Sequence, residues 1–241
     1  MIIFEITGRE DSPAYRDLEV SNGERQFDFL RSTVAASLAL KRPFISQHLL
    51  KALNFHAIAC LHTSAGEFRP CEVTVGAYRP PSPHRVQAQM DDFINQVNRA
   101  WETADPVFLA CYVLWRLNYI HPFINGNGRT ARAACLFVLC VKAGGWLSGE
   151  PILPDLLKRE RANYVAALQV ADRTFEATGD ADLRLLHGLV ASLLYEQLNG
   201  VRDEPQVDEP AAAAPVVENN IDPEEIRPRR EPDDNDAAVQ E

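Results

Sequence analysis

The sequence predicts a mainly α-helical protein with one small β-hairpin and a disordered acidic C-terminal tail, on three observations. Most of the first 200 residues place apolar side chains at helical spacing. One β-branched stretch, residues 73–78, interrupts this pattern and is followed by prolines. Residues 201–241 hold 13 acidic residues against four arginines and no aromatic side chain. Such a segment cannot bury enough apolar surface to offset chain entropy, so we expect it to be disordered. It is either a solvated tail or a segment for partner binding or localisation.

The composition excludes several classes of protein. Of the net charge of −10, the tail contributes −9, so the rest is nearly neutral and does not resemble a basic nucleic-acid binder. No apolar run approaches the roughly 18 residues of a membrane span, and the N-terminus lacks the pattern of a signal peptide. The five cysteines form no CxxC pair and no zinc-ligand cluster. We therefore expect reduced thiols, a cytoplasmic location and no membrane partner.

The predicted helices follow the apolar periodicity, and several carry start or stop signals. Ser46 is an expected N-cap, and Asp105 with Pro106 begins another helix. Gly144 and Gly145 end the most apolar one. The expected helices are 25–40, 46–61, 82–101, 106–119, 129–142, 154–169 and 180–198. The expected domains are an N-terminal extension at 1–24, a helical domain at 25–200 and the tail at 201–241.

The most informative stretch is residues 121–132, HPFINGNGRTAR. Arg129 and Arg132 fall at the start of a predicted helix, where the helix dipole disfavours cations by up to about 1 kcal/mol each. An anion of high charge, such as a polyphosphate, would explain both. Gly126 and Gly128 allow close approach of the backbone, and the amide of Asn127 can donate. The alternative is that both arginines pair with core carboxylates.

His121 lies at the other end of the same loop. Its ordinary pKa, near 6.5, suits a general base that takes a proton from a hydroxyl group. Residues 126–131 also match the dinucleotide fingerprint G-x-G-x-x-A. That fingerprint requires a preceding strand and a βαβ unit, whereas a helix precedes it here, so we set this reading aside.

At these residues the sequence resembles the Fic family. Residues 121–132 match its motif, H-P-F-x-[D/E]-G-N-G-R-x-x-R, at every defined position except Asn125. Residues 66–81 resemble the stretch that carries the family's flap, and residues 164–168 resemble a later family helix, so the resemblance covers roughly residues 20–200. It implies a Fic-type helical bundle with a small β-hairpin flap at about 68–80.

The resemblance also implies an activity, the transfer of AMP from ATP to a Ser, Thr or Tyr hydroxyl of a target protein. In that role His121 would deprotonate the hydroxyl group. The phosphates would be held by Gly126, Asn127, Gly128, Arg129 and Arg132. The target segment would be bound by strand addition to the flap residues Val73, Thr74, Val75 and Gly76.

Asn125 stands where the family has the carboxylate that holds Mg²⁺ (or Mn²⁺). An amide oxygen can ligate Mg²⁺ but carries no formal charge, and Mg²⁺ favours carboxylates and phosphates. Three readings follow: the metal binds mainly through the phosphates, the donor differs from ATP, or the site binds nucleotide and transfers little. The alternative function is thus a nucleotide-binding Fic-fold module with weak or altered chemistry.

Many family members carry an inhibitory helix with the pattern [S/T]-x-x-x-E-[G/N], whose glutamate pairs with the second arginine of the motif. Residues 192–197 approach this pattern, with Ser192 first and Glu196 as the glutamate. The alternative is an ordinary amphipathic helix with a surface glutamate. The inhibitory reading predicts contact between Glu196 and Arg132.

Overall fold

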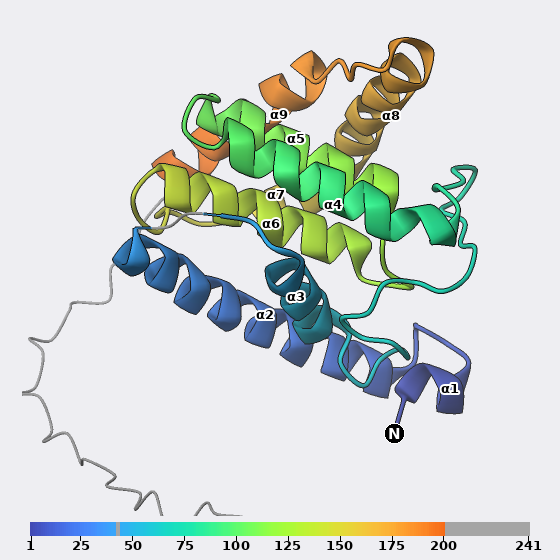
Figure 1. Ribbon diagram of the computed structural model, residues 1–241. Coiled ribbons are helices and arrows are strands. Elements are labelled where there is room, and N and C mark those ends of the chain that lie inside the picture. Colours follow the sequence, from blue (N-terminus) through green and yellow to red (C-terminus); the bar gives the residue numbers. More distant parts are fainter. Residues whose placement is uncertain (42–43, 201–241) are drawn as a thin grey trace, which may run out of the picture. The chain divides into compact units, whose positions relative to one another are not determined.

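The computed structural model describes residues 1–41 and 44–200, and this part of the chain is mainly helical (Figure 1). The predicted disordered tail, 201–241, lies outside the described residues. The helices in order are α1 (Ile3–Thr7), α2 (Pro13–Leu40), α3 (Gln47–Ile58), α4 (Pro83–Ala100), α5 (Pro106–Ile120), α6 (Asn127–Lys142), α7 (Leu153–Arg159), α8 (Arg161–Thr178) and α9 (Arg184–Asn199).

Helix α6 lies at the centre of the bundle (Figure 1). Twelve of its sixteen residues are buried, because α2, α3, α5 and α7 all pack against it. Helix α5 is similarly apolar and packs against α4, α6, α8 and α9. The short loop between α5 and α6, residues 121–126, is the motif stretch, so two buried helices hold its two ends.

The predicted helix caps at α3 and α5 are confirmed. The Ser46 side chain accepts from the Leu49 N–H at 3.1 Å, and that of Asp105 accepts from the Phe108 N–H at 2.8 Å. Each bond satisfies a backbone donor that has no partner within its helix.

The largest differences from the predicted helices are at α2 and at α7 and α8. Helix α2 begins at Pro13, with Ser12 as its N-cap, so the expected boundary between an extension at 1–24 and a domain from 25 falls inside one helix. The start signal, a serine before a proline, is present in the sequence, and Gly23 does not interrupt the helix. The single helix expected at 154–169 is two helices, α7 and α8, separated at Glu160.

The flap contains no strand within the described residues. It is an irregular segment, in which Val75 and Tyr78 form a bridge and exchange two backbone hydrogen bonds of 3.0 Å. Gly76 lies in the turn between them with φ 59°. A second bridge, between Phe68 and Phe123, joins the start of the flap to the motif loop. The predicted hairpin is therefore reduced to a tight turn.

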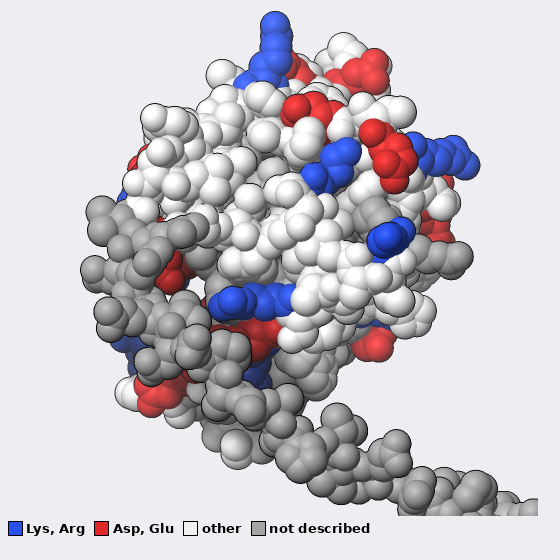
Figure 2. Space-filling model, turned by 90° about the vertical axis from the view of Figure 1, so that its left-hand side faces the viewer, with Lys and Arg blue, Asp and Glu red and all other residues white. Residues whose placement is uncertain are grey.

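The surface agrees with the nearly neutral charge of this part of the chain. On the face in Figure 2 the described Lys and Arg side chains are scattered among Asp and Glu, with no continuous field of one sign. No helix within the described ranges combines the length and apolarity needed to cross a membrane.

Candidate active site

His121 and Gly126 shape the loop between α5 and α6. His121 ends α5 in the left-handed conformation, with φ 51°, and its N–H donates to the Leu117 carbonyl at 3.0 Å. Gly126 precedes α6 with φ 75°, a conformation that costs a non-glycine residue about 1–2 kcal/mol. These two residues redirect the chain, so the imidazole and the N-terminus of α6 lie at opposite ends of a six-residue loop.

The side chain of Asn127 stabilises this loop from inside. Its Oδ1 accepts from the Phe123 N–H at 2.9 Å, and its Nδ2 donates to the Phe123 carbonyl at 2.8 Å. Asn127 is also buried. Both polar atoms of the side-chain amide therefore already have backbone partners, and the expected contact of Asn127 with phosphate stays a prediction.

Helix α3 packs directly on the other side of the loop. A Cβ at Gly126 would lie 2.6 Å from Ile58 Cγ2 and 3.0 Å from Asn54 Nδ2. Asn54 is fully buried, donates to the Asn125 carbonyl at 2.9 Å and accepts from the Gly66 N–H at 3.0 Å. Glycine at 126 therefore serves both its φ and the contact with α3.

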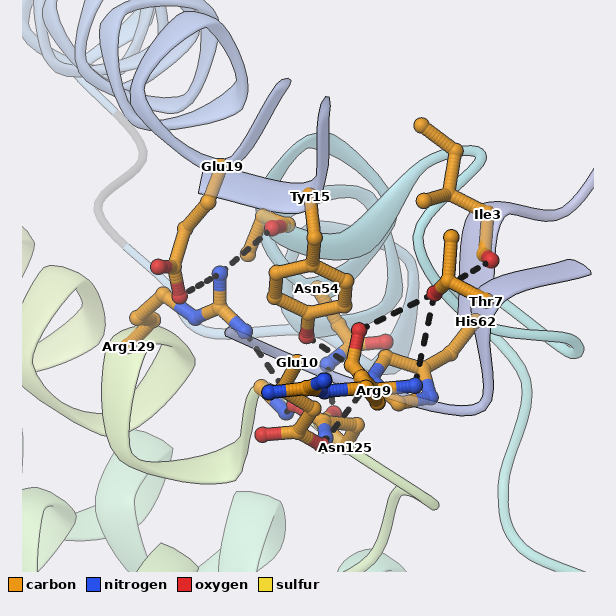
Figure 3. Close-up of polar contacts among 12 residues, drawn as sticks. Ile3, Thr7, Arg9, Glu10, Tyr15, Glu19, Asn54, His62, Asn125 and Arg129 are labelled. Carbon is orange, nitrogen blue, oxygen red and sulfur yellow. Dashed lines mark hydrogen bonds and ion pairs between the residues drawn. The ribbon is translucent and has the colours of Figure 1, made fainter. Parts of the chain in front are cut away.

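Arg129 is held by neighbours on three sides (Figure 3). It donates to the Ala57 carbonyl at 3.0 Å and to Asn125 Oδ1 at 3.1 Å, and it pairs with Glu19 of α2 at 3.1 Å. Arg129 thus pairs with a carboxylate, as in the alternative reading, but Glu19 is half-exposed and does not belong to the core. The acid comes from a helix that precedes the motif by about a hundred residues in the sequence.

Arg132 differs from Arg129. Within the described residues its side chain forms no ion pair or hydrogen bond. Burial lowers the pKa of its guanidinium. Together with Arg129 it lines a cavity of about 830 Å³ between α2, α6 and the segment 150–158. That volume is in the range of small-molecule sites. A Cβ at position 128 would lie 3.2 Å from Arg132 NH1, so Gly128 leaves space beside this guanidinium.

The His121 imidazole is neutral at pH 7. Its pKa is lowered from 6.5 to about 4, mainly by burial and to a smaller extent by the charge of Arg69, while a hydrogen bond with the backbone of Asn118 has the opposite effect. A neutral imidazole can accept a proton. His121 does not line the cavity that contains the two arginines, so the imidazole and the two guanidiniums belong to different parts of the motif.

Asn125 fits poorly as a metal ligand. Its Oδ1 accepts from the Gly126 N–H at 2.6 Å and from the Arg129 guanidinium, so a cation already faces the oxygen that would bind Mg²⁺. Its Nδ2 donates to Glu10 at 3.1 Å, and Glu10 also contacts His62 at 3.3 Å (Figure 3). In the described part of the chain, no group of three or more His, Cys, Asp or Glu side chains is arranged to hold a metal ion.

The expected target-binding residues lie together in the flap. Thr74, Val75 and Gly76 are exposed and Val73 is half-buried. Within the described residues, the backbone N–H groups of Val73 and Thr74 donate to no partner. The Tyr78 hydroxyl donates to the Tyr119 carbonyl at 2.6 Å, which ties the flap to the end of α5.

The predicted contact between Glu196 and Arg132 is wrong. Both oxygens of Glu196 accept from Arg159 at 2.7 Å, and Ser192 is exposed on the same helix, α9. The ordinary-helix reading of residues 192–197 is therefore the correct one. The carboxylate that does reach a motif arginine is that of Glu19, on α2.

Sequence reasoning missed four residues that contact the motif, residues 121–132: Glu10, Glu19, Asn54 and Arg69. The signal for Asn54 was a polar residue at the spacing of the apolar face of α3, four residues after Leu50. The other three had no local signal, because their contacts join segments far apart in the sequence.

Comparison with known proteins agrees with the resemblance. Residues 44–139 match the model of the Fic/DOC family. Protein adenylyltransferase fic-1 of Caenorhabditis elegans is 37% identical over 110 residues, which are 45% of this chain and 20% of that protein. Protein adenylyltransferase Fic of Aedes aegypti is 33% identical over 143 residues, 58% of this chain and 27% of that protein. The chain thus spans about a fifth to a quarter of the length of these relatives.

Solved structures share the fold. A fragment of Fic-1 from C. elegans (aa134–508) superposes with a TM-score of 0.59 at 27% identity, covering 75% of this chain and 49% of that one. A Fic domain containing signaling protein from Bacteroides thetaiotaomicron also gives a TM-score of 0.59, at 20% identity, covering 81% of this chain and 75% of that one. The second likeness concerns the fold alone.

Proposed function

We propose that this chain is a protein adenylyltransferase, because residues 44–139 match the model of the Fic/DOC family. It transfers AMP from ATP to a Ser, Thr or Tyr hydroxyl of a target protein. The named relatives support this activity, and the motif supplies the groups that it requires.

The observation that carries the proposal is the environment of Arg132. This arginine lines the cavity of about 830 Å³ and has no anionic partner among the described residues. This guanidinium is partly buried, and a phosphate group of a nucleotide would give it a charged hydrogen-bonding partner. Arg129 and the backbone N–H groups at the start of α6 add further donors for the phosphates of the same nucleotide.

The chemistry is an in-line displacement at the α-phosphorus. The target hydroxyl oxygen forms a bond to phosphorus, the bond to the pyrophosphate oxygen breaks, and the hydroxyl proton passes to the His121 imidazole. A base with a pKa of about 4 is weak. The negative phosphates raise its pKa when they bind, because an opposite charge nearby favours the imidazolium.

The flap positions the target in this proposal. The unpartnered N–H groups of Val73 and Thr74 offer hydrogen bonds to an extended target segment. Val75 and Gly76, at the exposed turn, complete the docking surface.

In this proposal a divalent metal ion binds to the protein only together with the nucleotide. The Asn125 oxygen already faces Arg129, so we assign it no part in binding Mg²⁺ or Mn²⁺. Of the three readings of Asn125, metal binding mainly through the phosphates of ATP accords best with the geometry. We place the reaction in the cytoplasm, as the five free thiols suggest.

A second candidate function is a nucleotide-binding module with little transfer. The ion pair between Glu19 and Arg129 favours it, since a carboxylate occupies a phosphate-binding arginine. The neutral His121 at the loop favours the enzyme, because a module that only binds nucleotide has no need of a base.

Intact mass measurement after incubation with ATP and Mg²⁺, with and without lysate proteins, separates the two candidates. The enzyme adds AMP to itself or to a lysate protein, and His121→Ala abolishes the addition. The binding module gives nucleotide binding, measured by calorimetry, with no added mass in either protein.

A further inference from the structure

Arg69 has an unusual environment at the base of the flap. Its side chain is only 2% exposed, and within the described residues it pairs with no carboxylate. Burial lowers the pKa of its guanidinium. A buried cation is costly unless its donors are hydrogen-bonded, so the groups that surround Arg69 must satisfy it.

Three backbone carbonyls satisfy this guanidinium. Nε donates to the His121 carbonyl at 2.8 Å, NH1 donates to the Cys71 carbonyl at 3.0 Å, and NH2 donates to the Pro81 carbonyl. The backbone N–H of Arg69 also donates to the Pro122 carbonyl at 2.8 Å. One residue therefore contacts two consecutive residues of the motif loop and both ends of the flap.

The geometry of this contact depends on arginine. The guanidinium is planar and presents its donors in a fixed fork, so the three carbonyls that it binds are held at fixed relative positions. His121 needs such support, because its left-handed backbone conformation is unfavourable for a residue other than glycine. A lysine ammonium is a point charge and cannot fix three carbonyls in one plane.

We infer that Arg69 is a positioning residue. It holds the flap and the His121 backbone at fixed relative positions, so that the hydroxyl group of a target segment bound to the flap lies next to the His121 imidazole. This inference rests on the proposed function. It concerns the transfer step and not nucleotide binding, since Arg69 does not line the cavity with Arg129 and Arg132.

The test compares Arg69→Lys and Arg69→Met with the wild type. Both variants should bind ATP as the wild type does, while the rate of AMP transfer at saturating ATP falls by about a hundredfold, the cost of misplacing reacting groups by about 1 Å. Asn98→Ala is the matched control. Asn98 also clamps backbone, through two hydrogen bonds to Ile45, far from the motif. It should lower thermal stability and leave transfer unchanged.

The titration of His121, followed by NMR of its imidazole, adds a readout that fold stability does not move. Arg69 is the charged side chain in the described structure whose field acts on His121. Arg69→Met should therefore raise the pKa of His121, whereas Arg69→Lys, which keeps the charge, should leave it near the wild-type value. If AMP transfer slows in Arg69→Lys while the pKa of His121 stays the same, the loss of rate comes from the altered positions of the flap and His121.

Transfer at the wild-type rate in Arg69→Lys would overturn the inference, and so would a loss of ATP affinity as large as the loss of transfer. If Arg69→Met fails to fold, the Lys variant decides. If the wild type transfers nothing, the proposed function fails. Amide hydrogen exchange then tests the positioning: Arg69→Lys should accelerate exchange at His121, Val75 and Tyr78 together. Unchanged exchange at these amides would overturn the inference independently of activity.

Discussion

Replacing Gly126 by alanine tests whether α3 packs directly against the motif loop. The new Cβ would lie 2.6 Å from Ile58 Cγ2, a distance at which either the Ile58 side chain or one of the two segments must shift. The left-handed φ of 75° costs about 1–2 kcal/mol for alanine. Overpacking of this kind costs about 1–3 kcal/mol more. We therefore expect Gly126→Ala to lower the free energy of unfolding by about 2–5 kcal/mol.

Gly179→Ala is the matched control. Gly179 also has a left-handed φ, 83°, but nothing lies within 4 Å of an added Cβ. Gly179→Ala should therefore lower the free energy of unfolding only by the cost of the left-handed backbone conformation, about 1–2 kcal/mol. In thermal unfolding followed by circular dichroism, Gly126→Ala should melt roughly 3–10 °C below Gly179→Ala for a chain of this size. Equal melting temperatures for the two variants would refute the direct packing of α3 on the loop.

Three further predictions concern single side chains. Because the pKa of His121 is lower in the folded chain than in the unfolded chain, the unfolded chain takes up the proton at a higher pH, and the free energy of unfolding should fall as the pH drops from about 6.5 to about 4. Denaturant unfolding of His121→Gln should show a smaller fall over the same pH range. An identical fall in the two proteins would contradict the low pKa of His121. Glu19→Gln should raise the affinity for ATP, measured by calorimetry, up to about fivefold. The substitution removes the ion pair between Glu19 and Arg129, which is half-exposed and stabilises by at most about 1 kcal/mol. A weaker affinity would contradict the role of Arg129 in binding phosphate. Glu196→Gly should leave ATP affinity and transfer unchanged, because Glu196 pairs with Arg159; a marked activation would restore the inhibitory reading.

The helical part of the fold was predictable because its signals are local. Ser46, Asp105 and Pro106 mark helix starts that the structure confirms. The start of α2 carries the same kind of signal at Ser12 and Pro13, but the periodicity before residue 25 is weak and the helix was placed too late. The flap was predicted as a hairpin because β-branched residues suit strands. In the described structure the pairing within the flap is limited to Val75 and Tyr78.

The candidate site residues could be singled out because one loop and the helix start after it carry them. The roles of His121, Gly126, Gly128 and Arg132 in transfer stay predictions. The hydrogen bonds of the Asn127 side chain to Phe123 were not predicted, because they depend on the exact turn of the loop.

Contacts between distant segments could not be predicted from one sequence. The pairing of Glu19 with Arg129 joins α2 to α6, and that of Asn125 with Glu10 joins the motif to the N-terminal segment. An amide at position 125 can donate to Glu10, whereas an aspartate there would set two carboxylates side by side. The residue that departs from the family pattern therefore matches a neighbour that the sequence alone could not identify.

The most direct test of the proposed activity uses ATP labelled either at the α-phosphorus or at the γ-phosphorus, incubated with the purified protein and lysate. The proposed reaction transfers label to protein only from the α-labelled nucleotide, and His121→Ala removes that signal while ATP binding persists. Label transferred from the γ-position, or equal α-labelling by the wild type and His121→Ala, would contradict AMP transfer with His121 as the base.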